Sequence, residues 1–160
     1  MPTTVLVELV PVAIDDPRLG RLLQLYQHEW SAVVATPIGD DALFTYAELP
    51  LYRDRDARAA YLFIDADNGR TPLGFALVMR DDTACWHVEE FFIVAGARRR
   101  GRGAVAARRL FIEHPGRWTF TVRPENPGAL AFWRRIVGDA DERVEVGSDG
   151  VVRRRLSFVA

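Results

Sequence analysis

The chain has 160 residues, 49% of them hydrophobic and 27% charged, a balance that excludes a disordered, collagen-like or coiled-coil protein. No apolar run approaches the roughly 20 residues of a membrane span, and the first residues lack the signals of a secretory leader. The single cysteine, Cys85, excludes an internal disulfide. We therefore expect one soluble, cytoplasmic domain over residues 1–160, without a membrane partner.

The charged residues are unevenly distributed along the chain. All 21 basic residues are arginines, and the absence of lysine excludes a P-loop NTPase, whose motif requires one. Residues 1–90 carry 7 arginines and 15 acids, whereas residues 91–160 carry 14 arginines and 7 acids. Six of the arginines lie between residues 98 and 109 with no acid among them, which indicates a site for an anion.

The first half of the chain reads as a strand, a helix and a set of antiparallel strands. Hydrophobic alternation predicts a strand at residues 4–12, and Asp16-Pro17 begins a helix whose apolar positions recur through Trp30. Residues 31–58 are irregular and predict a loop with a short helix. Turn signals then separate three strands that we expect to form a meander, at residues 61–66, 72–80 and 84–95.

The second half alternates helices with strands. Residues 101–114 predict a helix that Pro115-Gly116 ends, and residues 118–123 predict a strand. Asn126-Pro127 opens a helix through residue 137, and a hairpin of residues 143–146 and 151–158 closes the chain. This order predicts an α/β (α+β) domain: a mixed, mostly antiparallel central sheet with helices on both faces.

The most specific motif is the arginine- and glycine-rich stretch at residues 98–104, between a strand and a helix. Its glycines allow close backbone approach, and the free amides of a helix start favour an anion such as a pyrophosphate. Gly101-x-Gly103-x-x-Ala106 also fits a Rossmann fingerprint. That alternative is weakened because six residues separate the strand from the first glycine, the preceding strands form a meander, and only 57 residues follow Gly103.

Three segments in order resemble the Gcn5-related N-acetyltransferase (GNAT) superfamily. Arg98-x-x-Gly101-x-Gly103 fits the family's [RQ]-x-x-G-x-[GA] loop, residues 88–93 resemble its central strand, and residues 126–133 its N-x-x-A-x-x-[FY]-Y helix. The resemblance is strong over residues 86–137 and topological before them. It implies a GNAT fold, with acetyl-CoA as co-substrate and no metal.

The resemblance also implies which residues hold the coenzyme. The central strand and its separation from the next strand would accommodate the pantetheine arm, the loop would wrap the pyrophosphate, and the later helix would line the thiol end. The cofactor-binding residues implied are Phe91, Phe92, Ile93, Arg98, Arg99, Arg100, Gly101, Arg102, Gly103, Ala104, Asn126, Ala129, Phe132 and Trp133. For Asn126, a simple helix N-cap is an equally good interpretation.

Acetyl transfer to an amine requires a group that accepts the amine's proton, directly or through a water. Glu89 matches the catalytic glutamate of polyamine-type members of the family, so we expect it to be the general base, with Glu90 and His87 in reserve. Strict alternation places Cys85, His87, Glu89, Phe91 and Ile93 on one face of the strand, and Glu90, Phe92 and Val94 on the other. An ion pair with an arginine is the structural alternative for either glutamate.

One position departs from the family's pattern. The general acid is commonly a tyrosine, and Trp133 stands in its place; an indole N–H donates a hydrogen bond but is a poor acid. The thiolate leaves unaided, or another group, such as Tyr26, Tyr46, Tyr52 or Tyr61, protonates it. This departure leaves open a non-catalytic acyl-CoA-binding or sensor module. Cys85 carries no feature of a reactive thiolate, so we do not expect an acyl-enzyme.

The acceptor is expected to be a small-molecule or peptide amine, recognised by residues 27–58. The acidic first half mildly favours a cationic amine and opposes nucleic-acid binding by the arginine run. The closing hairpin could pair with a second copy in a homodimer.

Overall fold

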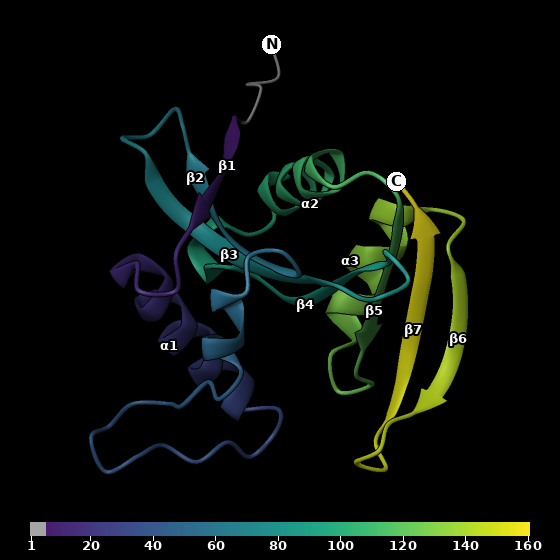
Figure 1. The fold of residues 1–160 in the computed structure, drawn as a ribbon. Coiled ribbons are helices and arrows are strands. Elements are labelled where there is room, and N and C mark those ends of the chain that lie inside the picture. Colours follow the sequence, from purple (N-terminus) through teal and green to yellow (C-terminus); the bar gives the residue numbers. More distant parts are fainter. Residues whose placement is uncertain (1–5) are drawn as a thin grey trace.

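The computed structural model describes residues 6–160. Seven strands and three α-helices follow one another along this part of the chain, with two short 3-10 turns between them (Figure 1). The elements are β1 (Val7–Val12), α1 (Pro17–Ser31), η1 (Leu49–Arg53), β2 (Arg58–Asp65), β3 (Thr71–Arg80), β4 (Trp86–Ile93), η2 (Ala95–Ala97), α2 (Arg102–Glu113), β5 (Arg117–Val122), α3 (Pro127–Val137), β6 (Asp141–Val146) and β7 (Val152–Val159).

The strands form one mixed sheet in the order β1-β2-β3-β4-β5-β7-β6. Every neighbouring pair is antiparallel except β4 and β5, which run parallel. The predicted meander, the closing hairpin and the mostly antiparallel sheet are therefore confirmed. The result is an α/β arrangement of one mixed sheet with helices on both faces, in agreement with the expected fold class.

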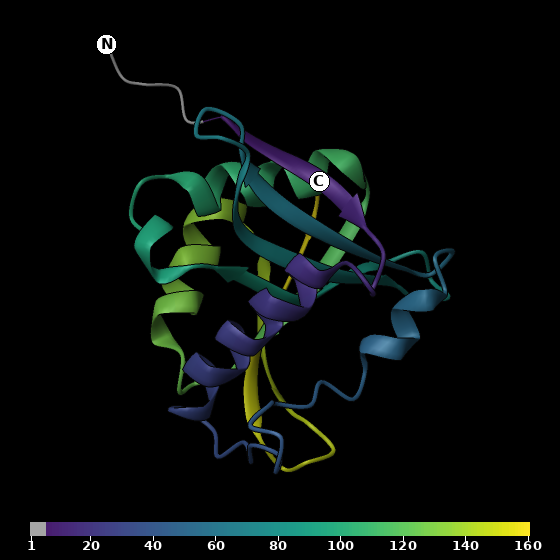
Figure 2. The same cartoon turned by 90° about the vertical axis from the view of Figure 1, so that its left-hand side faces the viewer.

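The helices cover the two faces of the sheet, as predicted. In Figures 1 and 2, α1 lies on one face and α2 and α3 on the other. Each face has its own apolar core. Leu19, Leu22 and Leu23 of α1 pack with Phe75, Leu77 and Phe92, and Leu110, Phe111 and Trp133 of α2 and α3 pack with Phe63, Trp118 and Phe120.

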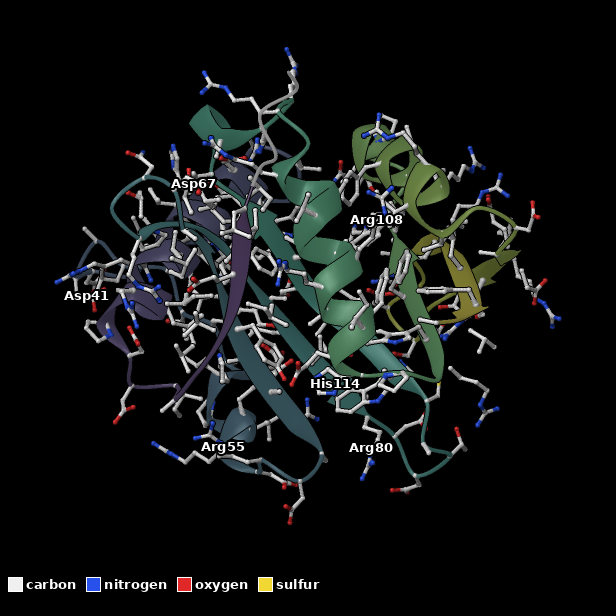
Figure 3. The ribbon with its side chains drawn as sticks, turned by 90° about the horizontal axis from the view of Figure 1, so that it is seen from above. Asp41, Arg55, Asp67, Arg80, Arg108 and His114 are labelled. Carbon is white, nitrogen blue, oxygen red and sulfur yellow. The ribbon has the colours of Figure 1, made fainter. Side chains whose placement is uncertain are left out.

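The C-terminal end of α2 is fixed to the base of β4 by aromatic contacts. The His114 ring lies 3.9 Å from that of Trp86, centroid to centroid, and its Nε2 is 2.7 Å from the Tyr61 hydroxyl. Figure 3 looks down on the molecule and shows His114 at the end of α2, close to Arg80 at the end of β3. These contacts orient α2 so that its N-terminal end reaches the opposite end of β4.

The predicted helix starts are confirmed at the atomic level. Asp16 and Asn126 are both N-caps, accepting hydrogen bonds from the amides of Arg18 and Ala129 at 2.9 and 3.1 Å, each followed by proline at the first helical position. Each cap involves residues only two or three positions apart, so these helix starts can be predicted from the sequence alone.

Several strand boundaries differ from the prediction. Residues 4 and 5 of the predicted first strand lie outside the described residues. In the described part of the chain, β1 begins at Val7. β2 begins at Arg58 and β6 at Asp141, earlier than predicted. β4 is shorter than residues 84–95, because the Asp81 carboxylate binds the Cys85 amide into a turn and the chain enters η2 at Ala95.

Candidate active site

The ladder between β4 and β5 is very short. The two parallel strands pair only at Trp86↔Trp118 and His87↔Thr119. Farther along β4, residues 91–93 pair with β3 but not with β5. The two strands therefore separate at the middle of the sheet, and the edge of Phe91, Phe92 and Ile93 that faces β5 is left without a strand partner.

A β-bulge interrupts β4 at this same point. Val88 is opposite Val78 and Glu90 is opposite Leu77, so Glu89 is the extra residue with no partner on β3. A bulge bends the strand and redirects side chains near a site. Here it falls on the two carboxylates that the sequence singled out.

The expected alternation of β4 is correct beyond the bulge, where Phe91 and Ile93 lie on the face opposite to Phe92, but the bulge makes it wrong for His87. Val88 shares the α2/α3 face with Phe91 and Ile93, where the first apolar core lies. His87 is paired with Met79, on the α1 face that also carries Glu90 and Phe92. A strict alternation does not hold along the whole strand, because one additional residue exchanges the faces on which the following side chains lie.

Glu90 is held beneath α1 by two tyrosines. Its carboxylate accepts hydrogen bonds from the hydroxyls of Tyr26, on α1, and Tyr46, in the loop before η1, the latter at 2.9 Å. Burial raises the pKa of Glu90 to about 7, although the two hydroxyl hydrogen bonds act in the opposite direction. Glu90 thus ties three segments together around a carboxylate that is easily protonated.

Glu89 is exposed and lines a cavity of about 340 Å³. The cavity lies between β4 and β5, is open to solvent, and is bordered by the β6–β7 hairpin. Its other lining residues are His87, Val88, Phe120, Thr121, Glu145, Gly147, Ser148, Asp149, Arg153 and Arg155. We expected residues 27–58 to surround the acceptor, but none of them lines this cavity. The sequence did not predict that the β6–β7 hairpin borders it, because the hairpin comes close to β4 only through the order of strands in the sheet.

The charges in this cavity are mostly paired. Arg155 binds Glu145 at 2.6 and 3.0 Å, and Arg153 binds Asp149 at 2.5 and 2.8 Å. Within residues 6–160 no arginine forms an ion pair with Glu89, so the ion-pair interpretation of that residue is not supported. The cavity therefore presents one unpaired carboxylate among neutralised charges.

The start of α2 presents a row of unpaired amides. In the described part of the chain, none of the backbone N–H groups of residues 99–104 donates to a protein acceptor. Gly101 has φ +74°, the left-handed conformation that glycine adopts without strain, and Arg99 has φ +61°. Gly103 has a different role, since a Cβ there would lie 3.3 Å from the Phe132 ring. The arrangement suits an anion at a helix N-terminus.

The arginines of this loop have different surroundings. Arg99 and Arg100 are exposed, whereas Arg98 donates to the Ile93 carbonyl at 2.7 Å and to Glu29 at 2.6 Å. Arg102 points inward to Asp65 at 2.7 Å, beneath the loop. Of the four arginines expected at the phosphate, Arg98 and Arg102 therefore have side chains that the protein itself binds. The backbone amides of Arg102 and Ala104 belong to the row without protein acceptors.

The helix α3 closes the α2/α3 side of the opening. The Trp133 ring is 6% exposed and packs against Phe91, Phe111, Phe120 and Phe132, with centroid distances of 4.5–6.3 Å. Ala129 and Phe132 are partly buried beside it, and Asn126 caps the helix. Trp133 is thus a core residue at the position where the family's tyrosine is expected.

Comparison with known families decides the assignment. Residues 20–138 match the model of the Acetyltransferase (GNAT) family. The chain belongs to the GNAT family. This match includes the bulged strand, the amide row and α3, the segments in which the motifs lie.

Solved structures share the GNAT fold at low sequence identity. An acetyltransferase from Thermus thermophilus has a TM-score of 0.72 at 19% identity, covering 98% of this chain and 99% of its own. A mutant form of the spermidine N-acetyltransferase SpeG from Vibrio cholerae has a TM-score of 0.65 at 12% identity, covering 96% and 93%. A Bacillus anthracis acetyltransferase in complex with acetyl coenzyme A has a TM-score of 0.56 at 12% identity, covering 69% and 67%.

No curated protein matches the sequence significantly. Among residues 6–160, no helix of this GNAT domain has the length and apolar character needed to cross a bilayer.

Proposed function

We propose that this protein transfers the acetyl group of acetyl-CoA directly to a primary amine, with Glu89 as the general base. The observation that carries the proposal is the position of Glu89: an exposed, unpaired carboxylate on the bulge, beside a cavity, where β4 leaves β5. A Bacillus anthracis protein of similar fold contains acetyl coenzyme A, which supports the choice of co-substrate.

The coenzyme is proposed to enter from the α2/α3 side. The six free amides of residues 99–104 bind the pyrophosphate, assisted by the helix dipole and the exposed Arg99 and Arg100. The unpaired edge of residues 91–93 hydrogen-bonds the pantetheine arm in place of a strand from β5. Ala129 and Phe132 of α3 cover the arm from the side.

The chemical step then needs one proton acceptor. The neutral amine attacks the thioester carbonyl, forming a C–N bond, and its proton passes to Glu89 directly or through a water. The C–S bond breaks, and CoA leaves as a thiolate that takes a proton from solvent. A free thiol has a pKa near 8.5, so the thiolate is a good enough leaving group without an acid from the protein.

The tyrosines are poorly suited to protonate the thiolate. The hydroxyls of Tyr26 and Tyr46 are bonded to Glu90, and that of Tyr61 to the histidine at the end of α2. Burial raises the pKa of Tyr26, Tyr46 and Tyr52 far above the ordinary value of a tyrosine, which makes these hydroxyls weaker proton donors. Unaided departure is therefore the pathway that we propose.

We propose a cationic amine as the acceptor. The two arginines of the cavity are neutralised by Glu145 and Asp149, which leaves Glu89 as an uncompensated negative charge. Opposite charge raises the encounter rate of a ligand with such a site. SpeG from Vibrio cholerae, a spermidine N-acetyltransferase of the same fold, is consistent with this choice.

Two measurements test the proposal in sequence. The first is the thermal shift of the protein with acetyl-CoA, CoA and NADH: at 100 times its dissociation constant a ligand adds about 2.7 kcal/mol, which for a chain of this size raises the melting temperature by roughly 5–11 °C. A shift with both CoA species and none with NADH is expected. The second is thiol release from acetyl-CoA with spermidine, an amino acid and a short peptide, where we expect the polyamine to react fastest.

A second candidate is a non-catalytic acyl-CoA-binding module. It is favoured by one observation, the burial of Trp133 where the family commonly has an acidic tyrosine. This alternative predicts the same thermal shift with acetyl-CoA but no amine-dependent thiol release.

A further inference from the structure

The turn between β3 and β4 brings three metal-ligating side chains together. Asp81 lies in the turn, Cys85 directly precedes β4, and His87 is the second residue of that strand; all three are partly buried. One ligand atom from each lies within 4.8 Å of the others. The resemblance to the family implied no metal, and the sequence alone does not show that Asp81 lies against Cys85 and His87.

We propose that Asp81, Cys85 and His87 bind one zinc ion. Thiolate, imidazole and carboxylate are the donors that zinc uses, with bonds of about 2.0–2.3 Å. Tetrahedral coordination at those lengths separates the donor atoms by about 3.3–3.6 Å. The Asp81 Oδ2 and His87 Nε2 atoms are 2.8 Å apart, so an opening of about half an ångström admits the ion between them.

The Asp81 carboxylate is already oriented for this role. Its Oδ1 atom accepts three hydrogen bonds from the turn: from the Thr83 amide at 2.9 Å, the Thr83 hydroxyl at 2.7 Å and the Cys85 amide at 3.0 Å. Oδ2 is therefore the oxygen left to face His87. Hydrogen bonds of this kind fix a metal ligand in place.

The three ligands share a cavity of about 430 Å³, which leaves space for a fourth ligand such as water. Ionised Asp81 and Cys85 balance the two charges of the ion. Two arginines also line the cavity but have partners of their own. Arg117 donates to the Thr83 carbonyl at 2.5 Å, and Arg155 binds Glu145. Within the described residues, neither arginine donates a hydrogen bond to one of the three ligands.

The proposed zinc site lies at the point where β4 and β5 separate. His87↔Thr119 is the last pair of the β4–β5 ladder, and the strands separate immediately beyond it. An ion held by Asp81, Cys85 and His87 therefore braces the base of that opening, two residues before Glu89. Its role is independent of acetyl transfer, so it is tested without an activity assay.

The test uses cobalt(II) as a spectroscopic substitute for zinc, added to the chelator-treated protein. Because Cys85 is the only cysteine, a thiolate-to-cobalt charge-transfer band identifies it as a ligand. We expect one cobalt per chain with that band, its displacement by zinc, and a zinc-dependent thermal shift of roughly 5–11 °C at 100 times the dissociation constant.

Variants locate the site. C85S is expected to lose the band, and H87Q and D81N to bind zinc at least tenfold more weakly; H28A, which removes an exposed histidine on α1, is the matched control and should bind normally. Should C85S fail to fold, zinc should still slow the reaction of wild-type Cys85 with a thiol reagent. Absence of the band in wild type, or unchanged zinc affinity in folded H87Q and D81N, overturns the proposal.

Discussion

The Arg102 guanidinium donates a 2.7 Å hydrogen bond to the Asp65 carboxylate, which is 3% exposed at the end of β2. This ion pair fixes the first turn of α2 to the sheet and so positions the free amides of the loop. The side chain of Arg102 therefore has a structural role beneath the loop, and in the proposed phosphate site only its backbone amide would face the ligand.

The loop arginines should consequently separate into two classes. Removing Arg102 leaves a buried carboxylate unpaired, which typically costs about 3–5 kcal/mol of folding free energy, so we expect Arg102→Ala to unfold well below wild type. Arg99→Ala and Arg100→Ala should leave the melting temperature unchanged and weaken acetyl-CoA binding severalfold, because both side chains are exposed. Calorimetric titration and melting curves measure the two effects. The control is Arg21→Ala on α1, and a stable Arg102→Ala would contradict this division.

Glu90 should make the protein less stable as the pH rises toward neutrality. Burial raises its pKa from 4.5 to about 7, so between these values the folded state holds a proton that the unfolded state has lost. Within that window the free energy of unfolding should fall by about 1.4 kcal/mol per pH unit. Urea unfolding at several pH values measures it.

The matched variant is Glu90→Gln, which cannot titrate and keeps an oxygen for Tyr26 or Tyr46. Its stability should lack this fall and should rise slightly toward neutral pH, because burial lowers the pKa of His114. A wild type with the same pH profile as the variant between pH 4.5 and 7 would show that Glu90 is ionised throughout.

Tyr52 carries a buried hydroxyl that has no hydrogen-bond partner in the described structure. An unsatisfied buried polar group costs about 1–3 kcal/mol. We expect Tyr52→Phe to raise the free energy of unfolding by about 1 kcal/mol and to leave turnover unchanged. A large loss of turnover in this variant, with acetyl-CoA binding intact, would instead assign the hydroxyl to the reaction.

Local signals in the sequence predicted much of this fold. The N-caps at Asp16 and Asn126, the closing hairpin and the glycine loop before α2 each depend on a few neighbouring residues. The same holds for the motif at residues 98–104, whose amides from residue 99 onward are unpaired in the described structure. These features require no knowledge of distant parts of the chain.

The details of the site were not predictable in the same way. The bulge at Glu89 follows from the register against β3, and the burial of Glu90 follows from tyrosines 64 and 44 residues away. Both depend on contacts between distant segments. The pairing of Asp81 with His87 likewise requires the turn geometry that residues 81–85 adopt.

The most direct test of the account compares wild type with Glu89→Gln in amine-dependent thiol release at saturating acetyl-CoA. Removal of a general base should lower kcat about 100- to 10,000-fold while the dissociation constant for acetyl-CoA stays within about twofold. Glutamine has nearly the same size as Glu89, which is exposed, so folding should be unaffected. A variant with wild-type kcat would contradict the role of Glu89 in proton transfer.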